Sequence, residues 1–129
     1  MERIDELVGR KREILSAYRS AFRDIAGASM NPEPEGTING AWMPALVLAP
    51  ERGVSREMLQ QAFTKEGIDA RVFFWPLSSL PMFTSRRGNA IAYSVPERSI
   101  NLPSFHDMTE QEQQFVISIA CRLLSESLA

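Results

Sequence analysis

The residues with the clearest chemical potential lie in one stretch of the chain, between Gly67 and Phe83. Alternation with period two, as in a strand, divides the first part of this stretch into two faces. One face holds Ile68, Ala70, Val72 and Phe74, and the other holds Asp69, Arg71, Phe73 and Trp75. We expect the first face to belong to the core. The second face places a cation beside two large aromatic rings, which favours a surface that a ligand or another layer of protein covers.

Other residues that could do chemistry are few. His106, the only histidine, stands beside Asp107 in a predicted loop, where it could form a catalytic dyad or, as is commoner, simply lie at the surface. The only lysines are Lys11 and Lys65. Both have charged neighbours on predicted helices, which is not the apolar setting that activates a lysine for Schiff-base chemistry. Cys121, the single cysteine, lies in a helical pattern and is interpreted as a packed side chain rather than a reactive thiol.

The composition is that of one soluble domain, residues 1–129. Hydrophobic residues make up 44% of the chain and charged residues 23%, and the formal net charge of -2 gives no reason to expect nucleic-acid binding. No apolar run approaches the roughly 20 residues of a membrane span, and the charged first residues do not resemble a secretory signal. A single cysteine excludes a disulfide framework and a thiolate metal cluster. We therefore expect a cytoplasmic location, with no membrane and no nucleic-acid partner.

Hydrophobic periodicity predicts an α+β fold. Helices are predicted over residues 2 to about 25, 56–66, 86–94 and 109 to about 127, and strands over 42–49, 68–75 and 99–102. The domain then consists of a long N-terminal helix within residues 1–26, a loop over 27–40, and an α+β body over 41–129. The adjacent Arg86 and Arg87 could meet a phosphate, although such a pair is more often a solvated turn.

Several residues mark where these elements begin and end. Ser55 is a typical N-cap, Gly67 suits a left-handed helix stop, and Thr109 with Glu112 forms a capping box. Pro44 lacks a ladder donor and favours an edge position or a bulge. The last helix carries an apolar stripe of Phe115, Val116, Ile119, Ala120, Leu123 and Leu124.

Five segments carry a resemblance to a known family. They are Ser55–Leu59, Gly67–Arg71, Phe73–Leu77, Ile100–Ser104 and Met108–Glu112. Together they resemble the C-terminal part of the DegT/DnrJ/StrS family of pyridoxal-phosphate-dependent nucleotide-sugar aminotransferases, with the perosamine-synthase-like members nearest. The resemblance covers most of the chain, and its most specific parts are the arginine-aromatic-proline segment and the leucine-proline strand end.

The resemblance implies a small antiparallel sheet flanked by helices, as in the C-terminal domain of fold type I aminotransferases. In the family this domain packs over the active site against a large domain, which holds the cofactor lysine and its supporting acid. The matching segments contain neither, so we expect no catalytic residue and no bound cofactor in this chain alone. The implied partners are the missing large domain or a second copy in a homodimer, and the implied substrate is a 4-keto-6-deoxy sugar nucleotide.

The resemblance also assigns site residues. The segment from Arg71 to Ser79 matches the part of the family that lines the substrate entrance. The candidates for substrate contact are Arg71, Phe73, Phe74, Trp75 and Ser78. Many members carry a histidine at the position of Ser78. A hydroxyl there can still hydrogen-bond a substrate, whereas a role that needs imidazole is lost.

Three interpretations follow. The first is the C-terminal domain, or a truncated form, of a sugar-nucleotide aminotransferase that is not catalytically competent alone. The second is a stand-alone interaction module that keeps the fold and uses the Arg71–Trp75 face for a protein partner. The third is a structural remnant without a role.

Overall fold

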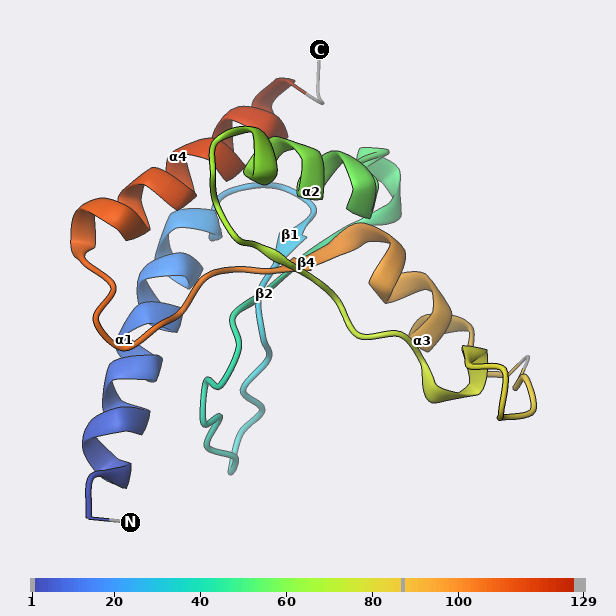
Figure 1. The fold of residues 1–129 in the computed structure, drawn as a ribbon, viewed down its shortest axis with the longest axis horizontal. Coiled ribbons are helices and arrows are strands. Elements are labelled where there is room, and N and C mark those ends of the chain that lie inside the picture. The colour runs from blue at the N-terminus through green and yellow to red at the C-terminus, as the bar shows by residue number, and fades with distance from the viewer. Residues whose placement is uncertain (1, 87, 127–129) are drawn as a thin grey trace.

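A four-stranded antiparallel sheet lies at the centre of the computed structural model, which describes residues 2–86 and 88–126 (Figure 1). The strand order is β1 (Ala28–Ser29), β2 (Ala45–Leu48), β4 (Ser99–Asn101) and β3 (Arg71–Val72). The helices are α1 (Ile4–Phe22), α2 (Arg56–Lys65), α3 (Ala90–Ser94) and α4 (Glu110–Glu126), with 3-10 turns at Pro50–Arg52, Leu77–Ser79 and Val95–Arg98. The α+β fold with a small antiparallel sheet flanked by helices is therefore confirmed.

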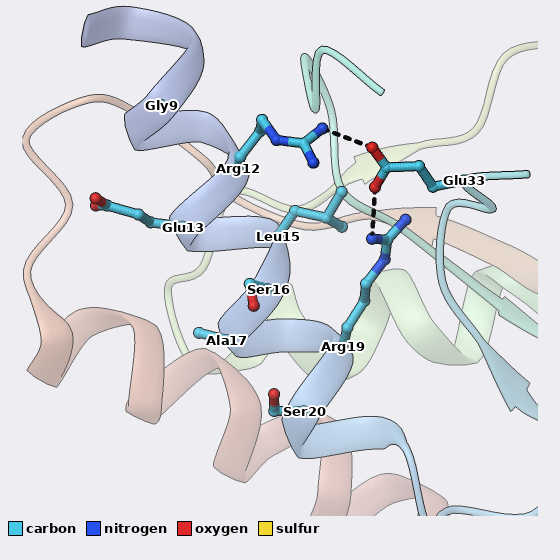
Figure 2. A pocket seen from close by; sticks show the side chains of 9 residues that line it. All are labelled: Gly9, Arg12, Glu13, Leu15, Ser16, Ala17, Arg19, Ser20 and Glu33. Carbon is cyan, nitrogen blue, oxygen red and sulfur yellow. Dashed lines mark hydrogen bonds and ion pairs between the residues drawn. The ribbon is translucent and has the colours of Figure 1, made fainter. Parts of the chain in front are cut away.

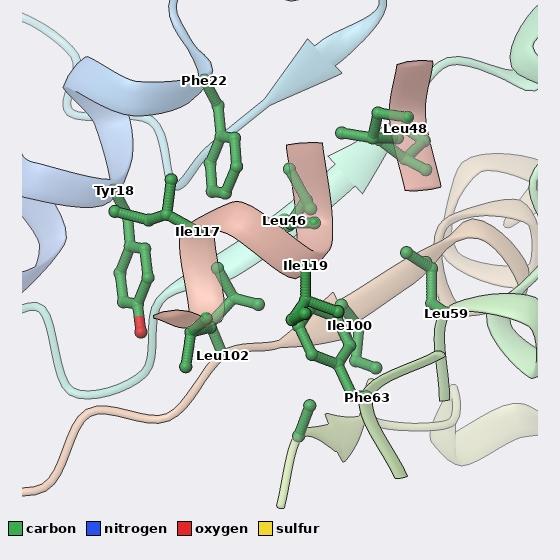
Figure 3. Packing of buried hydrophobic residues seen from close by; sticks show 14 of the residues in the cluster. Tyr18, Phe22, Leu46, Leu48, Leu59, Phe63, Ile100, Leu102, Ile117 and Ile119 are labelled. Atoms are coloured by element: carbon green, nitrogen blue, oxygen red, sulfur yellow. The ribbon is translucent and has the colours of Figure 1, made fainter. Parts of the chain in front are cut away.

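The hydrophobic core lies between the sheet and three of the helices. It draws side chains from α1, β2, α2, β4 and α4. Figure 3 shows Tyr18 and Phe22 of α1 and Leu59 and Phe63 of α2 directed into one cluster, together with Leu46, Leu48, Ile100, Leu102, Ile117 and Ile119. The rings of Tyr18 and Phe22 stack with their centroids 6.3 Å apart. By contrast, α3 and the segments on either side of it extend away from this core (Figure 1).

The predicted helix caps are present. The Ser55 hydroxyl accepts from the Met58 amide at 3.3 Å, and Gly67 is left-handed with φ of 71°. At the start of α4 the Glu112 amide donates to the Thr109 hydroxyl at 3.2 Å, while the Glu112 carboxylate accepts from the Thr109 amide at 2.7 Å. These reciprocal bonds satisfy donors that the first helical turn leaves unpaired.

The N-terminal third differs from the prediction. The first helix spans Ile4–Phe22, inside the predicted 2–25, because the chain turns after Phe22 to bring Ile25 against the core. Residues 27–40 are not wholly a loop, since Ala28 and Ser29 pair with Leu48 and Val47. The α+β body therefore begins before residue 41. Two residues are too few to show an alternating pattern, so β1 left no signal in the sequence.

The predicted strands are also longer than the observed ones. Instead of 42–49, β2 spans Ala45–Leu48, and it lies between β1 and β4. Pro44 is therefore neither on an edge strand nor in a bulge. It is buried just before the strand, and its carbonyl accepts from the Leu102 amide at 2.8 Å. Of the strand predicted over 68–75, only Arg71–Val72 forms a strand. Of the helix predicted over 86–94, only Ala90–Ser94 is α-helical.

Candidate functional site

The segment that follows β3 is the most exposed apolar part of the sheet edge. Because β3 pairs only with β4 and only through Arg71 and Val72, the chain leaves the sheet at Phe73. The prediction that Ile68, Ala70, Val72 and Phe74 form a core face is therefore wrong for its second half. Ala70 is buried and Ile68 is half-buried, whereas Val72 is 37% exposed and Phe74 is 59% exposed.

Trp42 joins this segment from a distant part of the chain. Its ring stacks on that of Phe74, with centroids 6.1 Å apart and planes 11° from parallel. Phe73 meets Phe74 edge-on at 6.3 Å. Trp42 is 69% exposed, so this stack stands at the surface. We call Trp42, Phe73, Phe74 and Trp75 the aromatic surface.

The ring of Trp75 packs against the guanidinium of Arg56, which belongs to α2. The guanidinium carbon of Arg56 lies 4.2 Å from the centroid of the Trp75 ring, and Arg56 also pairs with Glu57 at 2.6 Å. A guanidinium over an indole face is attracted by the ring quadrupole. This contact orients Trp75 while leaving the side chain 50% exposed.

Arg71 is the cation on the edge strand itself. Its guanidinium donates to Asp69 at 2.8 Å, and both side chains are about three-quarters exposed. Exposed pairs of this kind contribute little to stability. The Arg71 guanidinium can therefore exchange Asp69 for another anion at low cost.

Ser78 contacts a tyrosine of the short helix α3. The Ser78 and Tyr93 hydroxyl oxygens lie 2.7 Å apart, and the Ser85 hydroxyl and Arg86 amide lie 3.5 and 3.4 Å from the Tyr93 oxygen. These hydrogen bonds, that of Ser78 first, hold the pKa of Tyr93 below its ordinary value of 10.0 because they stabilise the phenolate. Ser78 thus fixes the loop to α3.

A shallow groove of about 800 Å³ separates the aromatic surface from α3. It is lined by residues 73–76 on one side and by residues 88–92 with Val95 and Pro96 on the other. Most of these side chains are apolar, and Ile91 is 78% exposed. The predicted candidates Phe73, Phe74 and Trp75 line this groove. Arg71 precedes them on β3, and Ser78 lies in the 3-10 turn Leu77–Ser79 that follows them.

A second polar cluster fixes the loop that ends at Trp42. Figure 2 shows Arg12 and Arg19 of α1 converging on the carboxylate of Glu33, at 2.7 and 3.2 Å. The Asn39 amide donates to the same carboxylate at 3.0 Å. Together these donors, Arg12 first, lower the pKa of Glu33 to about 2. Glu33 therefore stays ionised and ties the loop to α1.

The other predicted chemical residues have structural partners. His106 is a half-buried loop residue whose Nε2 lies 3.6 Å from the Glu6 carboxylate. Burial raises the pKa of the Cys121 thiol, as expected for a packed side chain. Arg86 is exposed, and Arg87 lies outside the described residues. Among residues 2–86 and 88–126, no cluster of His, Cys, Asp and Glu could hold a metal ion, and no helix has the length and apolar character needed to cross a membrane.

Neither lysine fits a pyridoxal-phosphate Schiff base. The Lys11 ammonium donates to the carbonyl and, at 3.0 Å, to the hydroxyl of Ser104. Lys65 is exposed on α2, beside the ion pair of Glu66 with Arg122. A Schiff-base lysine needs a desolvated pocket that also receives the cofactor ring. The described residues provide no such setting.

Sequence reasoning missed three residues of this region. The strand predicted over 42–49 includes Trp42, and no sequence pattern distinguishes Glu33 or Tyr93. Pro44 gave a signal for Trp42, because a strand that begins after the proline leaves the tryptophan outside the sheet. Glu33 and Tyr93 gave none, since their partners lie 6 to 21 residues away.

Comparisons with known proteins relate the chain to sugar aminotransferases. Residues 1–120 match the DegT/DnrJ/EryC1/StrS aminotransferase family. The chain is 31% identical over 117 residues to GDP-perosamine synthase of Vibrio cholerae, covering 87% of this chain and 31% of that protein. It is 30% identical over 129 residues to EpsN of Bacillus subtilis strain 168, whose assignment as a pyridoxal phosphate-dependent aminotransferase is provisional, covering 95% and 33%.

A solved aminotransferase shares the fold. The solved aminotransferase TlmJ of Streptoalloteichus hindustanus superposes with a TM-score of 0.85 at 19% identity, covering 99% of this chain and 34% of that one. The chain thus spans about a third of the length of the proteins it matches.

Proposed function

The chain belongs to the DegT/DnrJ/EryC1/StrS aminotransferase family, and we propose that its residues 1–129 form the small C-terminal domain of an enzyme that aminates a 4-keto-6-deoxy sugar nucleotide. The observation that carries the proposal is the aromatic surface, which stands uncovered beside the exposed guanidinium of Arg71. This domain has a well-buried core and one large exposed aromatic face. Such an exposed face is typical of a domain that packs against another domain.

The proposed contacts follow from the side chains. Flat apolar faces of a sugar pack on aromatic rings, which Phe73, Phe74 and Trp75 present. The guanidinium of Arg71 has the fork geometry that binds phosphate oxygens in pairs. Ser78 offers a hydroxyl to the substrate or holds the loop closed through Tyr93. None of these groups forms or breaks a bond; they bind and orient.

The family's cofactor, pyridoxal phosphate, supplies the amino-group chemistry. Because neither Lys11 nor Lys65 has a suitable setting, we propose that these 129 residues do not transfer an amino group by themselves. The cofactor lysine and the acid that pairs with the pyridine nitrogen belong to a large domain. The proposed partner of the aromatic surface is that domain, in a cytoplasmic enzyme.

A chimera tests this function. This chain replaces the matching third of the Vibrio cholerae GDP-perosamine synthase, and amino transfer to a 4-keto-6-deoxy sugar nucleotide is measured with a panel of amino-acid donors. We expect activity in the chimera and none in the chain alone. The change Arg71→Ala should raise KM for the sugar nucleotide more than it lowers kcat, since Arg71 binds and does not react. Amino transfer by the chain alone, or a folded chimera that binds cofactor but accepts no sugar nucleotide, contradicts the proposal.

One observation also favours a second candidate, a protein-interaction module. Trp42, Phe74 and Trp75 are each half exposed or more, and aromatic residues of this kind are common anchors of protein interfaces. In the module reading, the chimera stays inactive and the same side chains bind another protein.

A further inference from the structure

Trp42 is an exposed tryptophan whose position is fixed on both sides. On its N-terminal side, the buried Ala41 is left-handed with φ of 52°, and its amide donates to the Asn39 side chain at 2.8 Å. On its C-terminal side, the Asn31 side chain donates to the Met43 carbonyl at 2.9 Å and accepts from the Ala45 amide at 2.7 Å.

The loop that carries Trp42 is in turn bound to α1. Glu33 links it to Arg12 and Arg19, and the two guanidinium groups also donate to the carbonyls of Asn39 and Asn31. A non-glycine residue in the left-handed region is strained and persists only where its surroundings fix it. The backbone therefore holds Trp42 out in solvent instead of letting the ring collapse onto the core.

The exposed ring of Trp42 stacks on the ring of Phe74. Trp42 and Phe74 lie within 11° of parallel, and Trp42 remains 69% exposed. Phe74 lies nearly parallel to the indole in an offset stack, so most of the Trp42 ring stays accessible. Such an exposed ring accepts another planar ring, since every nucleobase offers a π-face for stacking.

The register of the sheet brings a cation near the same place. Ala45 and Arg71 both pair with Asn101, so the three residues form one row across β2, β4 and β3. Two strand spacings separate Ala45 from Arg71, or about 10 Å. Because β2 and β3 both run antiparallel to β4, they are parallel to each other. Trp42 precedes this row and Phe74 follows it, so along the strand direction Arg71 lies between the two residues whose rings stack. A molecule with a planar ring at one end and a diphosphate a few bonds away matches this arrangement.

We propose that Trp42, backed by Phe74, is the stacking surface for the base of the sugar nucleotide, with Arg71 facing its diphosphate. This inference rests on the proposed function and adds to it a residue and the part of the substrate that this residue binds. No bond is made or broken at this surface. Its role is to set affinity for the nucleotide and to place the sugar over the groove.

The test uses the full chain labelled with 5-fluorotryptophan. Its two indoles, Trp42 and Trp75, give separate fluorine resonances, and the change Trp42→Leu identifies the first. GDP, UDP and dTDP are titrated individually, with inorganic pyrophosphate as the probe that has the charge without the base. We expect a saturable shift of the Trp42 resonance with nucleoside diphosphates, larger than that of Trp75, and none with pyrophosphate.

Matched variants then measure affinity by calorimetry. Loss of one stacked base corresponds to a roughly 5- to 150-fold higher dissociation constant, which we expect for Trp42→Leu. Trp42→Phe keeps a ring and should retain most of the affinity. Ile38→Ala removes a side chain that is 84% exposed in the same loop and should change nothing.

The outcomes separate this inference from the proposed function. Equal nucleotide affinity in wild type and Trp42→Leu, with binding lost in Arg71→Ala, overturns the stacking role and leaves the proposed function standing. If no nucleotide binds at millimolar concentration while the chimera is active, the stacking role is again overturned and the proposed function again stands. If Trp42→Leu alters only self-association while nucleotides leave both resonances unmoved, the stack is a protein interface and the inference is wrong.

Discussion

At the scale of single residues, Glu33 is a carboxylate held by donors from two parts of the chain. It accepts from Arg12, Arg19 and the Asn39 amide, and these contacts lower its pKa from 4.5 to about 2. A carboxyl whose pKa is lower in the folded state stabilises the fold above the unfolded pKa. That stability is lost as the pH falls from about 4.5 towards 2.

We therefore expect Glu33→Gln to destabilise the protein in a pH-dependent way. The gap in urea midpoint between wild type and Glu33→Gln should be widest above pH 5 and should shrink as the pH falls to 3. In that range the unfolded carboxyl, with a pKa near 4.5, takes up a proton, whereas the folded carboxylate, with a pKa of about 2, does not. Glu35→Gln, an exposed change in the same loop, is the control. A gap that is constant from pH 3 to 7 contradicts the ionic role of Glu33.

The two tyrosines are expected to ionise at opposite extremes. Burial raises the pKa of Tyr18 well above 10, whereas the hydroxyl of Ser78 and the neighbouring donors lower that of Tyr93. An ultraviolet pH titration should show one phenol ionising below pH 10 and the other only at the alkaline limit or on unfolding. Ser78→Ala should move the first step upward and leave the second in place. A single step for both tyrosines would mean that the contact between Ser78 and Tyr93 does not form in solution.

At the scale of elements, α4 shows which sequence signals were reliable. Its cap was readable because Thr109 and Glu112 are local partners. Its stripe was only partly readable, since Phe115 is 46% exposed while Gln113 and Ile117, outside the predicted stripe, are buried. The Gln113 side chain donates to the Ile14 carbonyl of α1 at 2.8 Å, a contact across 99 residues that no periodicity reveals.

Two substitutions on α4 and one at its N-cap should therefore differ in cost. Leu124→Ala should lower the free energy of unfolding by about 2–5 kcal/mol, since a buried side chain leaves a cavity. Thr109→Ala should cost about 0.5–2 kcal/mol through the lost cap. Phe115→Ala should cost about 1 kcal/mol, because half of the ring already contacts water. Denaturant unfolding measures all three, and a larger cost for Phe115→Ala than for Leu124→Ala would place the core on the other side of α4.

The strands show where sequence reasoning fails for physical reasons. Alternation over residues 68–75 is real, yet a strand persists only as far as a neighbour pairs with it, and β4 offers three residues. The aromatic residues 73–75 therefore lie outside the sheet, at the surface of the domain. Arg71, Phe73 and Trp75 are singled out by the sequence because a cation beside two large aromatic rings is unusual on a solvent face, whereas Phe74 is predicted to lie in the core and becomes a candidate only through the family resemblance. Trp42 was missed because its stacking partner lies 32 residues away.

At the scale of the whole molecule, the buried residues and the exposed ones are unevenly distributed. Helices α1, α2 and α4 share one core with the sheet, while α3 and the loops around it extend to one side (Figure 1). The exposed large apolar side chains on or near that side are Trp42, Phe74, Trp75, Leu77, Met82, Phe83 and Ile91. A surface so rich in exposed apolar groups is usually covered by another part of an assembly.

We expect the chain on its own to cover this surface by self-association, with a dimer as the first species. Burying one large side chain contributes roughly 1.5–3 kcal/mol, so two rings from each of two copies offset much of the cost of association. Trp75 should lie at the contact together with Phe74, because Phe73 is already half-buried within the monomer. Sedimentation should show wild-type dimers that the double change Phe74→Ser, Trp75→Ser dissociates without loss of helical signal. The control Phe105→Ser removes a ring that is 49% exposed beyond β4, and should leave the dimer intact. A wild-type monomer at high concentration, or a dimer that survives the double change and yields to Phe105→Ser, would mean that the aromatic surface is not the contact between copies.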